Sequence, residues 1–308
     1  MLAVGLAGPD RAWHVVDAID HLCPQKFPQA EAEFRELILA GEALVEVGAL
    51  TVRDVERGSD VEQRVVGFLK RTMQDTDARG RFYKRPRVPI PTRYAAAETL
   101  DRLDWLPKDL NAFVEIPIPK SQTPNRVYVA RYPVTNAQFA LFIAAGGYEN
   151  ASYWGGEGSD AWRGRTGKPR YGWQRTDAPD RWDDPRFGKS RRGLPVVGVS
   201  WYEANAYCAF LVELLQRFRE GEELPTLQRD LVANLPADVA VVRLPTEEEW
   251  VAAAGGAEDE RYPWGPDWHE SRANTSEGSV GGTTPVGMYP SGPSPAGVWN
   301  LGGNVWGW

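Results

Sequence analysis

Residues 300–308 have the sequence NLGGNVWGW, which combines turn-forming residues with tryptophans in a way that is typical of the second half of the chain. Two asparagines flank a Gly-Gly pair, and both residue types accept turn conformations that helices and strands avoid. The two tryptophans supply large rings whose indole N–H groups can bond to loop carbonyls. The stretch therefore predicts an ordered loop that is held in place by aromatic packing.

The same composition extends over the second half, because eleven of the thirteen tryptophans lie from Trp154 onward. Apolar stretches at 113–118 and 126–132 predict two short strands. Residues 146–193 show no period and predict a long ordered loop region. We therefore expect an α+β domain over residues 113–308, with sparse strands and long ordered loops.

Capping residues mark three helix starts in this domain. Thr135 precedes one apolar helical pattern. Ser200 and Thr246 each open a capping box, with a glutamate three residues later that can return a hydrogen bond. Gly255, followed by a second glycine, predicts the end of the third helix, since glycine accepts the left-handed conformation there.

Residues 1–105 read differently, as a small all-helical segment. Apolar residues recur at helical spacing within 28–48, 61–69 and 92–103. Each helix is short and one-sided and must bury its apolar stripe against a neighbour. Three such helices form a thin core, so we expect this segment to be the end of a longer helical array or a linker.

Composition and charge exclude several classes of protein. The 308 residues suit about two domains. The 35 Lys and Arg against 42 Asp and Glu give a net charge of −7, which argues against a nucleic-acid partner. No apolar run approaches the roughly 18 residues of a membrane span, and the first 25 lack a signal h-region. Two cysteines cannot build a disulfide framework, so we expect a cytoplasmic protein with no membrane partner.

Six motifs occur in one order along residues 113–308, and together they resemble the formylglycine-generating enzyme family, also called the sulfatase-modifying factor family. The motifs are RYPVTN at 131–136, PVVGVSWYEA at 195–204, RLPTEEEW at 243–250, YPWG at 262–265, TPVG at 284–287 and the opening stretch at 300–308. The resemblance implies a C-type-lectin-like fold, which agrees with the α+β prediction made from the residues alone.

The resemblance implies several activities. Some members are copper oxidases that convert a sulfatase cysteine to formylglycine, and others are iron-dependent sulfoxide synthases. Further members of unknown activity are fused to signalling ATPases, and the same fold serves as a display scaffold in diversified proteins. In the oxidases a copper-binding cysteine pair follows the Gly-Asn-x-Trp-x-Trp motif, and two thiolates suit Cu(I). We expect this pair, and the final strands of the fold, to lie beyond Trp308 in a longer protein.

The cysteines and histidines of this chain predict no catalytic residue. Cys208 falls on the inward face of the helix after Ser200 and reads as an inert core cysteine. Cys23 has no metal-ligating partner at a useful spacing. The histidines are His14, His21 and His269, which do not form the cluster that an iron site needs.

Calcium is the metal that the resemblance implies. By motif match, one site would use Asn274 with the carbonyl of Thr275, and a second would use Asn300 with the carbonyls of Gly303 and Val305. Oxygen ligands on loops are what Ca²⁺ prefers. Gly278 and Gly307 stand where the family usually has acidic residues, which predicts lower affinity. The alternative is that both asparagines cap turns by bonding to nearby backbone.

A ligand surface is predicted in the long loop region. Exposed tryptophan and arginine together suit a protein or peptide partner. The candidate residues are Trp154, Trp162, Arg163, Arg165, Trp173 and Trp182. Six other tryptophans of the second half are predicted to pack in the core, namely Trp201, Trp250, Trp264, Trp299, Trp306 and Trp308.

Two functions remain open from the sequence. The first is a non-catalytic ligand- or partner-binding module of a larger multidomain protein, with a signalling ATPase as one candidate parent. The alternative is a copper-dependent oxidase that converts a sulfatase cysteine to formylglycine, with its cysteine pair downstream of Trp308. A narrower form of the first is a diversified binder whose variable segment follows Trp308.

Overall fold

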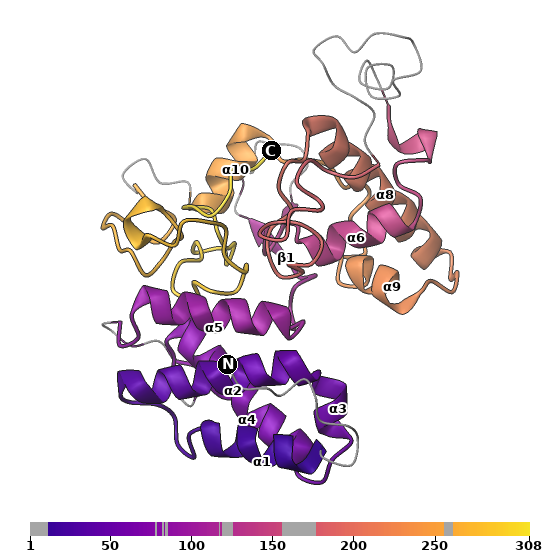
Figure 1. The fold of residues 1–308 in the computed structure, drawn as a ribbon. Helices are drawn as coiled ribbons and strands as arrows, with labels where there is room; N and C mark the ends of the chain where they lie inside the picture. Colours follow the sequence, from indigo (N-terminus) through magenta and orange to yellow (C-terminus); the bar gives the residue numbers. More distant parts are fainter. Residues whose placement is uncertain are drawn as a thin grey trace.

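The computed structural model describes residues 12–77, 79–81, 83, 86–116, 118, 126–155, 177–255 and 261–308. Figure 1 shows two regions that lie against each other, an all-helical first region and a second region of helices, loops and one small sheet. The mixed architecture confirms the α+β prediction for the second region. Among the described residues, no helix is both long enough and apolar enough to cross a membrane.

The first region contains the three predicted helices and two more. The predicted ones are α2 (Glu31–Val47), α4 (Gly58–Gln74) and α5 (Ile90–Arg102), and the additional ones are α1 (Ala12–Leu22) and α3 (Ala49–Arg53). Their apolar faces form one core that includes Leu37, Leu44, Val65, Leu69 and Leu100. The two extra helices also contribute to this core, which makes it larger than the three-helix prediction.

The core of the first region also takes in residues from the second. Met288 and Tyr289 lie among the buried side chains of the helical core. In Figure 1, α5 lies between the other helices of the first region and the yellow loops that contain these residues. The two regions therefore share buried surface and do not meet only through a linker.

The sheet of the second region has two strands among the described residues. β1 (Phe113–Ile116) pairs antiparallel with β2 (Val127–Ala130), with Phe113 opposite Ala130. Both strands fall inside the predicted stretches. One face of the sheet packs with Ala253 and Val298, so the hairpin is covered by the helix and the loop that follow much later in the chain.

Helices of the second region start where capping residues predicted them. The three are α6 (Asn136–Ala144), α8 (Trp201–Arg219) and α10 (Glu247–Ala254), preceded by Thr135, Ser200 and Thr246. In α8 the Glu203 N–H donates to Ser200 Oγ at 3.3 Å, and the Ser200 N–H donates back to Glu203 Oε2 at 2.7 Å. Gly255 ends α10 at φ 126°. The structure adds α9 (Thr226–Val232), which the sequence did not predict.

An aromatic core fills the space between α6 and α8. It contains Phe139, Phe142, Tyr148, Tyr207 and Phe210, together with Trp154 from the long loop region. The Trp154 indole N–H donates to the Gly147 carbonyl at 2.9 Å. The described parts of the loop region are therefore anchored by aromatic packing, as the sequence predicted.

Candidate functional site

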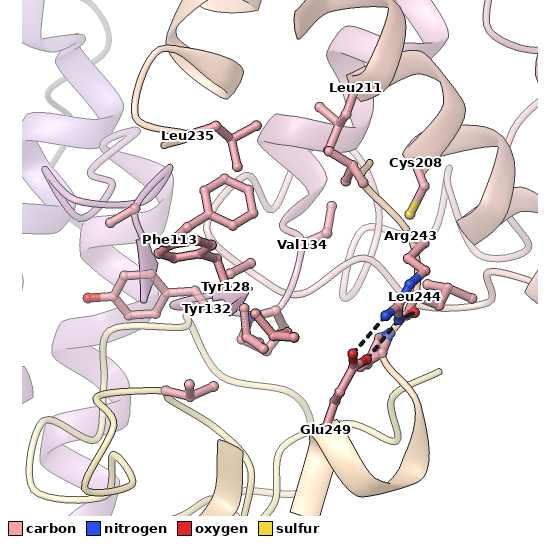
Figure 2. Close-up of a pocket in the computed structure, with 18 of the residues that line it drawn as sticks. Phe113, Tyr128, Tyr132, Val134, Cys208, Leu211, Leu235, Arg243, Leu244 and Glu249 are labelled. Atoms are coloured by element: carbon pink, nitrogen blue, oxygen red, sulfur yellow. Dashed lines mark hydrogen bonds and ion pairs between the residues drawn. The ribbon is translucent and has the colours of Figure 1, made fainter. Parts of the chain in front are cut away.

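An open groove of about 630 Å³ lies between the sheet, α8 and the segments 238–245 and 298–308. Most of its lining is apolar, and Figure 2 shows Phe113, Tyr128, Val134, Leu211 and Leu235 pointing into it. Ligand-binding sites are usually pockets of this volume with mostly apolar walls. The groove is therefore the strongest candidate site in the described part of the chain.

Local sequence places each wall of the groove. Phe113 and Tyr128 come from β1 and β2, whose alternating side chains reach both faces of the hairpin. Cys208 and Leu211 are three residues apart on α8 and so lie on one face of that helix. The segment 239–244 supplies a further apolar wall, and Val241 within it is 65% exposed.

The charged groups at the rim are paired with one another. Glu249 accepts two hydrogen bonds from the Arg243 guanidinium, each at 2.7 Å (Figure 2). This bond from Arg243 is the main cause that lowers the pKa of Glu249, which is buried. Glu249 also accepts the Thr246 N–H at 2.8 Å, so the capping box of α10 fixes it in place.

A second ion pair closes the rim on the side of the sheet. Arg126 donates to both carboxylate oxygens of Glu115, at 3.0 and 2.9 Å, and also reaches Asp238 at 3.3 Å. Because each of these charged groups already has an oppositely charged partner, the groove favours an occupant whose buried surface is uncharged. Their exposure limits what the pairs add to stability.

Cys208 lines the groove but is not set up as a nucleophile. Burial raises the pKa of its thiol to about 11. The thiolate is the reactive form, so this cysteine stays protonated near neutral pH. Cys23 is also buried and its pKa is likewise raised to about 11, but it belongs to the helical core. The two cysteines lie apart, because Cys23 is in the helical core and Cys208 is on the wall of the groove.

A second polar feature joins the loop around Asn274 to the loop at 300–308. The Asn274 Nδ2 group donates to the Gly282 carbonyl at 2.7 Å and to Asn304 Oδ1 at 3.0 Å. The Asn304 N–H in turn donates to the Asn274 carbonyl at 2.9 Å. A Cβ on Gly303 would lie 2.4 Å from that same carbonyl oxygen, so glycine allows the two loops to touch.

Comparison with known families assigns this region. The model of the sulfatase-modifying factor enzyme 1-like domain matches residues 109–308. The chain belongs to this family.

Relatives in the sulfatase-modifying factor family carry different names. Hercynine oxygenase of Mycobacterium tuberculosis is 31% identical over 197 residues, covering 58% of this chain and 36% of that protein. Serine/threonine-protein kinase pkn1 of Chlamydia caviae is 30% identical over 182 residues, covering 58% and 21%. Inactive C-alpha-formylglycine-generating enzyme 2 of Bos taurus is 34% identical over 126 residues, covering 37% and 32%. The chain thus spans about a third or less of the length of these relatives.

The asparagines that the family resemblance implied as calcium ligands differ in their surroundings. The Asn274 Nδ2 group donates to Gly282 and to Asn304 and so ties two loops together, whereas the calcium prediction concerns its Oδ1. Asn300 differs, because its backbone is left-handed at φ 62° and its buried Oδ1 has no hydrogen-bond partner among the residues that the structure describes. Within the described residues no three His, Cys, Asp or Glu side chains gather into a metal-binding group. Neutral oxygens around Asn300 fit a weak calcium site at most.

The predicted tryptophan and arginine surface needs correction at Trp154. This side chain is 4% exposed and packs in the aromatic core, so it does not form part of an exposed surface. Trp182 is half-buried and packs edge-on against Phe139, with ring centroids 6.3 Å apart. Trp162, Arg163, Arg165 and Trp173 lie outside the described residues.

Trp201 and Trp250, which the sequence assigned to the core, are instead 51% and 44% exposed. Trp250 and Trp308 both line the groove. The Trp308 indole N–H does donate to a loop carbonyl, that of Val199, at 2.8 Å. These residues, with the apolar walls of the groove, are what the sequence prediction missed. The walls of the groove come from segments that are far apart in the chain. A local pattern in a single sequence therefore does not predict that these segments form a groove.

Proposed function

We propose that this chain is a non-catalytic ligand- or partner-binding domain of the sulfatase-modifying factor family, within a larger multidomain protein. The groove is its binding site. The observation that carries the proposal is the combination of a mostly apolar groove of about 630 Å³ with rim charges that are already held in ion pairs with one another. The occupant presents an uncharged apolar surface, such as the side chains of a protein or peptide partner.

The state of Cys208 supports a binding role for the groove over nucleophilic catalysis in it. Its thiol faces the groove, yet burial holds the pKa near 11, so almost no thiolate exists at neutral pH. The name of the bovine relative, an inactive formylglycine-generating enzyme, is consistent with a non-catalytic member. The aligned region makes up only 21% of the kinase relative, which supports a larger multidomain protein as the source of this domain.

The alternative function is a copper-dependent oxidase that acts on a sulfatase cysteine. It needs two neighbouring thiolates, and Cys23 and Cys208 cannot supply them because one lies in the helical core and the other on the wall of the groove. Reading the coding sequence past codon 308 distinguishes the two functions. Two closely spaced cysteines there would favour the oxidase, with Cu(I) loading as the next test. Their absence would favour the binding domain.

We propose two finer properties of this domain. Its topology is C-type-lectin-like, as the family resemblance implies. Asn300 Oδ1, with the carbonyls of Gly303 and Val305, binds Ca²⁺ weakly. Thermal unfolding with millimolar CaCl₂ tests the second property. Asn300→Asp should increase the stabilisation by calcium and Asn300→Ala should abolish it. If calcium leaves the melting temperature of each of the three proteins unchanged, the site is ruled out.

Binding of an uncharged apolar dye tests the groove. Nile red fluorescence should rise on titration with the wild-type chain. Val241→Lys should weaken dye binding at least about fivefold, because it places a charge on the apolar wall. Val241 is already exposed, so the lysine head can reach water and the fold should survive. Leu227→Lys is the matched control, since Leu227 is 60% exposed on α9 and does not line the groove. Equal dye affinity of the Val241→Lys and Leu227→Lys proteins would contradict the proposal.

A further inference from the structure

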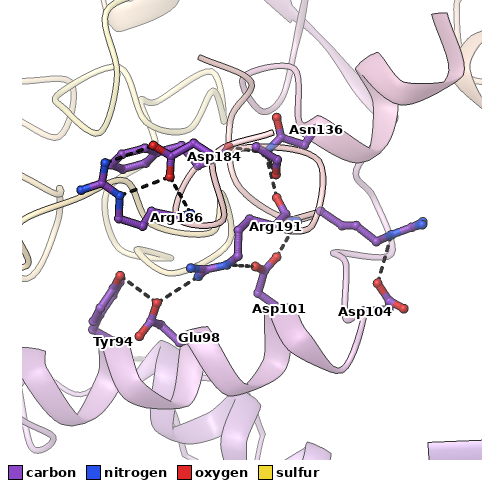
Figure 3. Close-up of polar contacts among 12 residues, drawn as sticks. Tyr94, Glu98, Asp101, Asp104, Asn136, Asp184, Arg186 and Arg191 are labelled. Atoms are coloured by element: carbon purple, nitrogen blue, oxygen red, sulfur yellow. Dashed lines mark hydrogen bonds and ion pairs between the residues drawn. The ribbon is translucent and has the colours of Figure 1, made fainter. Parts of the chain in front are cut away.

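Asp101, at the end of α5, makes a buried contact with the second region. Its side chain is fully buried, and its two carboxylate oxygens accept hydrogen bonds from Arg191 Nε and from the Gly193 N–H, both at 2.6 Å (Figure 3). Burial raises the pKa of Asp101, and the bond from Arg191 opposes that shift. A carboxylate held this way fixes both the side chain and the backbone of the loop that it contacts.

Two other α5 residues support the same contact. Glu98 lies one turn before Asp101 and pairs with Arg191 Nη2 at 3.1 Å. Tyr94 Oη donates to Glu98 at 3.0 Å. Residues 94, 98 and 101 fall on one stripe of the helix, so α5 presents a row of polar groups to the loop around Arg191 (Figure 3).

Gly193 is what lets the loop approach α5 so closely. A Cβ at this position would lie 2.9 Å from Asp101 Oδ1. A larger residue at this position would require the Asp101 carboxylate to shift. The backbone at Gly193 is therefore held to the first region by a hydrogen bond to Asp101 as well as by packing.

The same loop pairs with the segment that enters α6. The Asn136 N–H donates to the Leu194 carbonyl at 2.9 Å, and the Ala137 N–H donates to the Arg192 carbonyl at 3.0 Å. The Val196 N–H donates to the Val134 carbonyl at 2.9 Å. These hydrogen bonds fix residues 134–137 relative to residues 192–196, so a shift of one segment should move the other.

Residues 134–137 border the groove. Val134 and Gln138 both line it, and Val134 points into it in Figure 2. A continuous series of hydrogen bonds thus runs from Asp101 through Gly193 and its neighbours to Val134. We propose that the helical region holds the groove in its binding shape, with Asp101 as the positioning residue. Its effect on ligand affinity rests on the proposed function of the groove.

Hydrogen exchange tests the positioning. In Asp101→Asn we expect amide exchange to accelerate at least about tenfold in peptides covering 132–138 and 192–198, while peptides from α8 exchange as in wild type. A residue that only adds global stability would change exchange in all of these peptides alike. Glu98→Gln is a milder variant of the same contact and should give a smaller change in the same two peptides. Asp104→Asn is the control, because Asp104 pairs with Arg192 across the same boundary at the exposed surface.

Nile red titration of the same proteins tests the consequence for binding. Asp101→Asn should weaken dye binding at least about threefold, and Asp104→Asn should leave it unchanged. Wild-type exchange rates in both peptides of Asp101→Asn and Glu98→Gln would overturn the positioning role. Local acceleration with unchanged dye affinity would overturn the link to the groove. If the wild-type chain fails to bind the dye, the proposed function fails, while the exchange result still decides whether Asp101 positions the loop.

Discussion

The Arg93 guanidinium of α5 donates a hydrogen bond at 2.8 Å to the carbonyl of Met288, a residue 195 positions later in the chain. The same side chain donates to the Met73 carbonyl at 2.9 Å, and only 2% of it is exposed. Arg93 also lies over the Tyr289 ring, 5.2 Å from its centroid. One buried cation thus connects two helices of the first region to a loop of the second.

Replacing Arg93 with methionine should destabilise the chain by about 1–3 kcal/mol. Two buried carbonyls would lose their donors, at about 1–3 kcal/mol each. Removing a buried charge, whose pKa burial already lowers, offsets part of this loss. Urea unfolding measures the difference. Arg102→Met is the control, because Arg102 is an exposed residue of the same helix. Equal stability of the two variants would show that Arg93 does not connect the regions energetically.

The shared core predicts that both regions unfold in one transition. Met288 is fully buried among the side chains of the helical core. Met288→Ala should cost about 2–5 kcal/mol and lower the urea midpoint of helix circular dichroism and of tryptophan fluorescence together. Leu227→Ala, at an exposed site, serves as the control. Two separate transitions in the wild-type chain would contradict a common core.

Helix starts were predictable from the sequence where a side chain caps them. Thr135, Ser200 and Thr246 each accept the backbone N–H three residues later, and this signal is local. α9 was missed because it begins after Pro225 with no side-chain cap and has only seven residues. Short helices of this kind are stabilised by tertiary packing, which the sequence of the segment alone does not show.

The candidate site was harder to predict than the fold. Tryptophan has an apolar body and a polar N–H, so its presence does not distinguish core from surface. Trp154 was expected at a surface and is buried, whereas Trp250 was expected in the core and is exposed. The groove itself forms only when the sheet, α8 and the segment 239–244 come together. The residues of each wall are visible in the sequence, but no local pattern indicates that the walls come together in the fold.

The Arg243–Glu249 pair predicts a loss of stability in acid. The pKa of Glu249 is lowered in the folded state, so its contribution is present above the unfolded-state pKa and is lost as pH falls through the lowered folded-state value. Glu249→Gln should cost about 1.5–3 kcal/mol at neutral pH and should flatten the fall in stability below about pH 4.5. Glu248→Gln, an exposed change in the same helical turn, should retain the wild-type pH profile. Parallel profiles for Glu249→Gln and wild type would show that this pair does not titrate with unfolding.

The contact between Gly303 and Asn274 gives a prediction within the stretch that identifies the family. An alanine Cβ at position 303 would lie 2.4 Å from the Asn274 carbonyl oxygen, which the Asn304 N–H also uses. Gly303→Ala should therefore push the two loops apart and lower the melting temperature by several degrees, as expected for a strained position that costs about 1–3 kcal/mol. Gly307→Ala is the matched control, because a Cβ there meets nothing within 4 Å. The amide of Asn304 should also exchange faster in Gly303→Ala than in Gly307→Ala, since its bond to Asn274 is the one displaced. Equal melting temperatures and equal exchange would mean that the loops accommodate the extra methyl, and that glycine at 303 is not required for their contact.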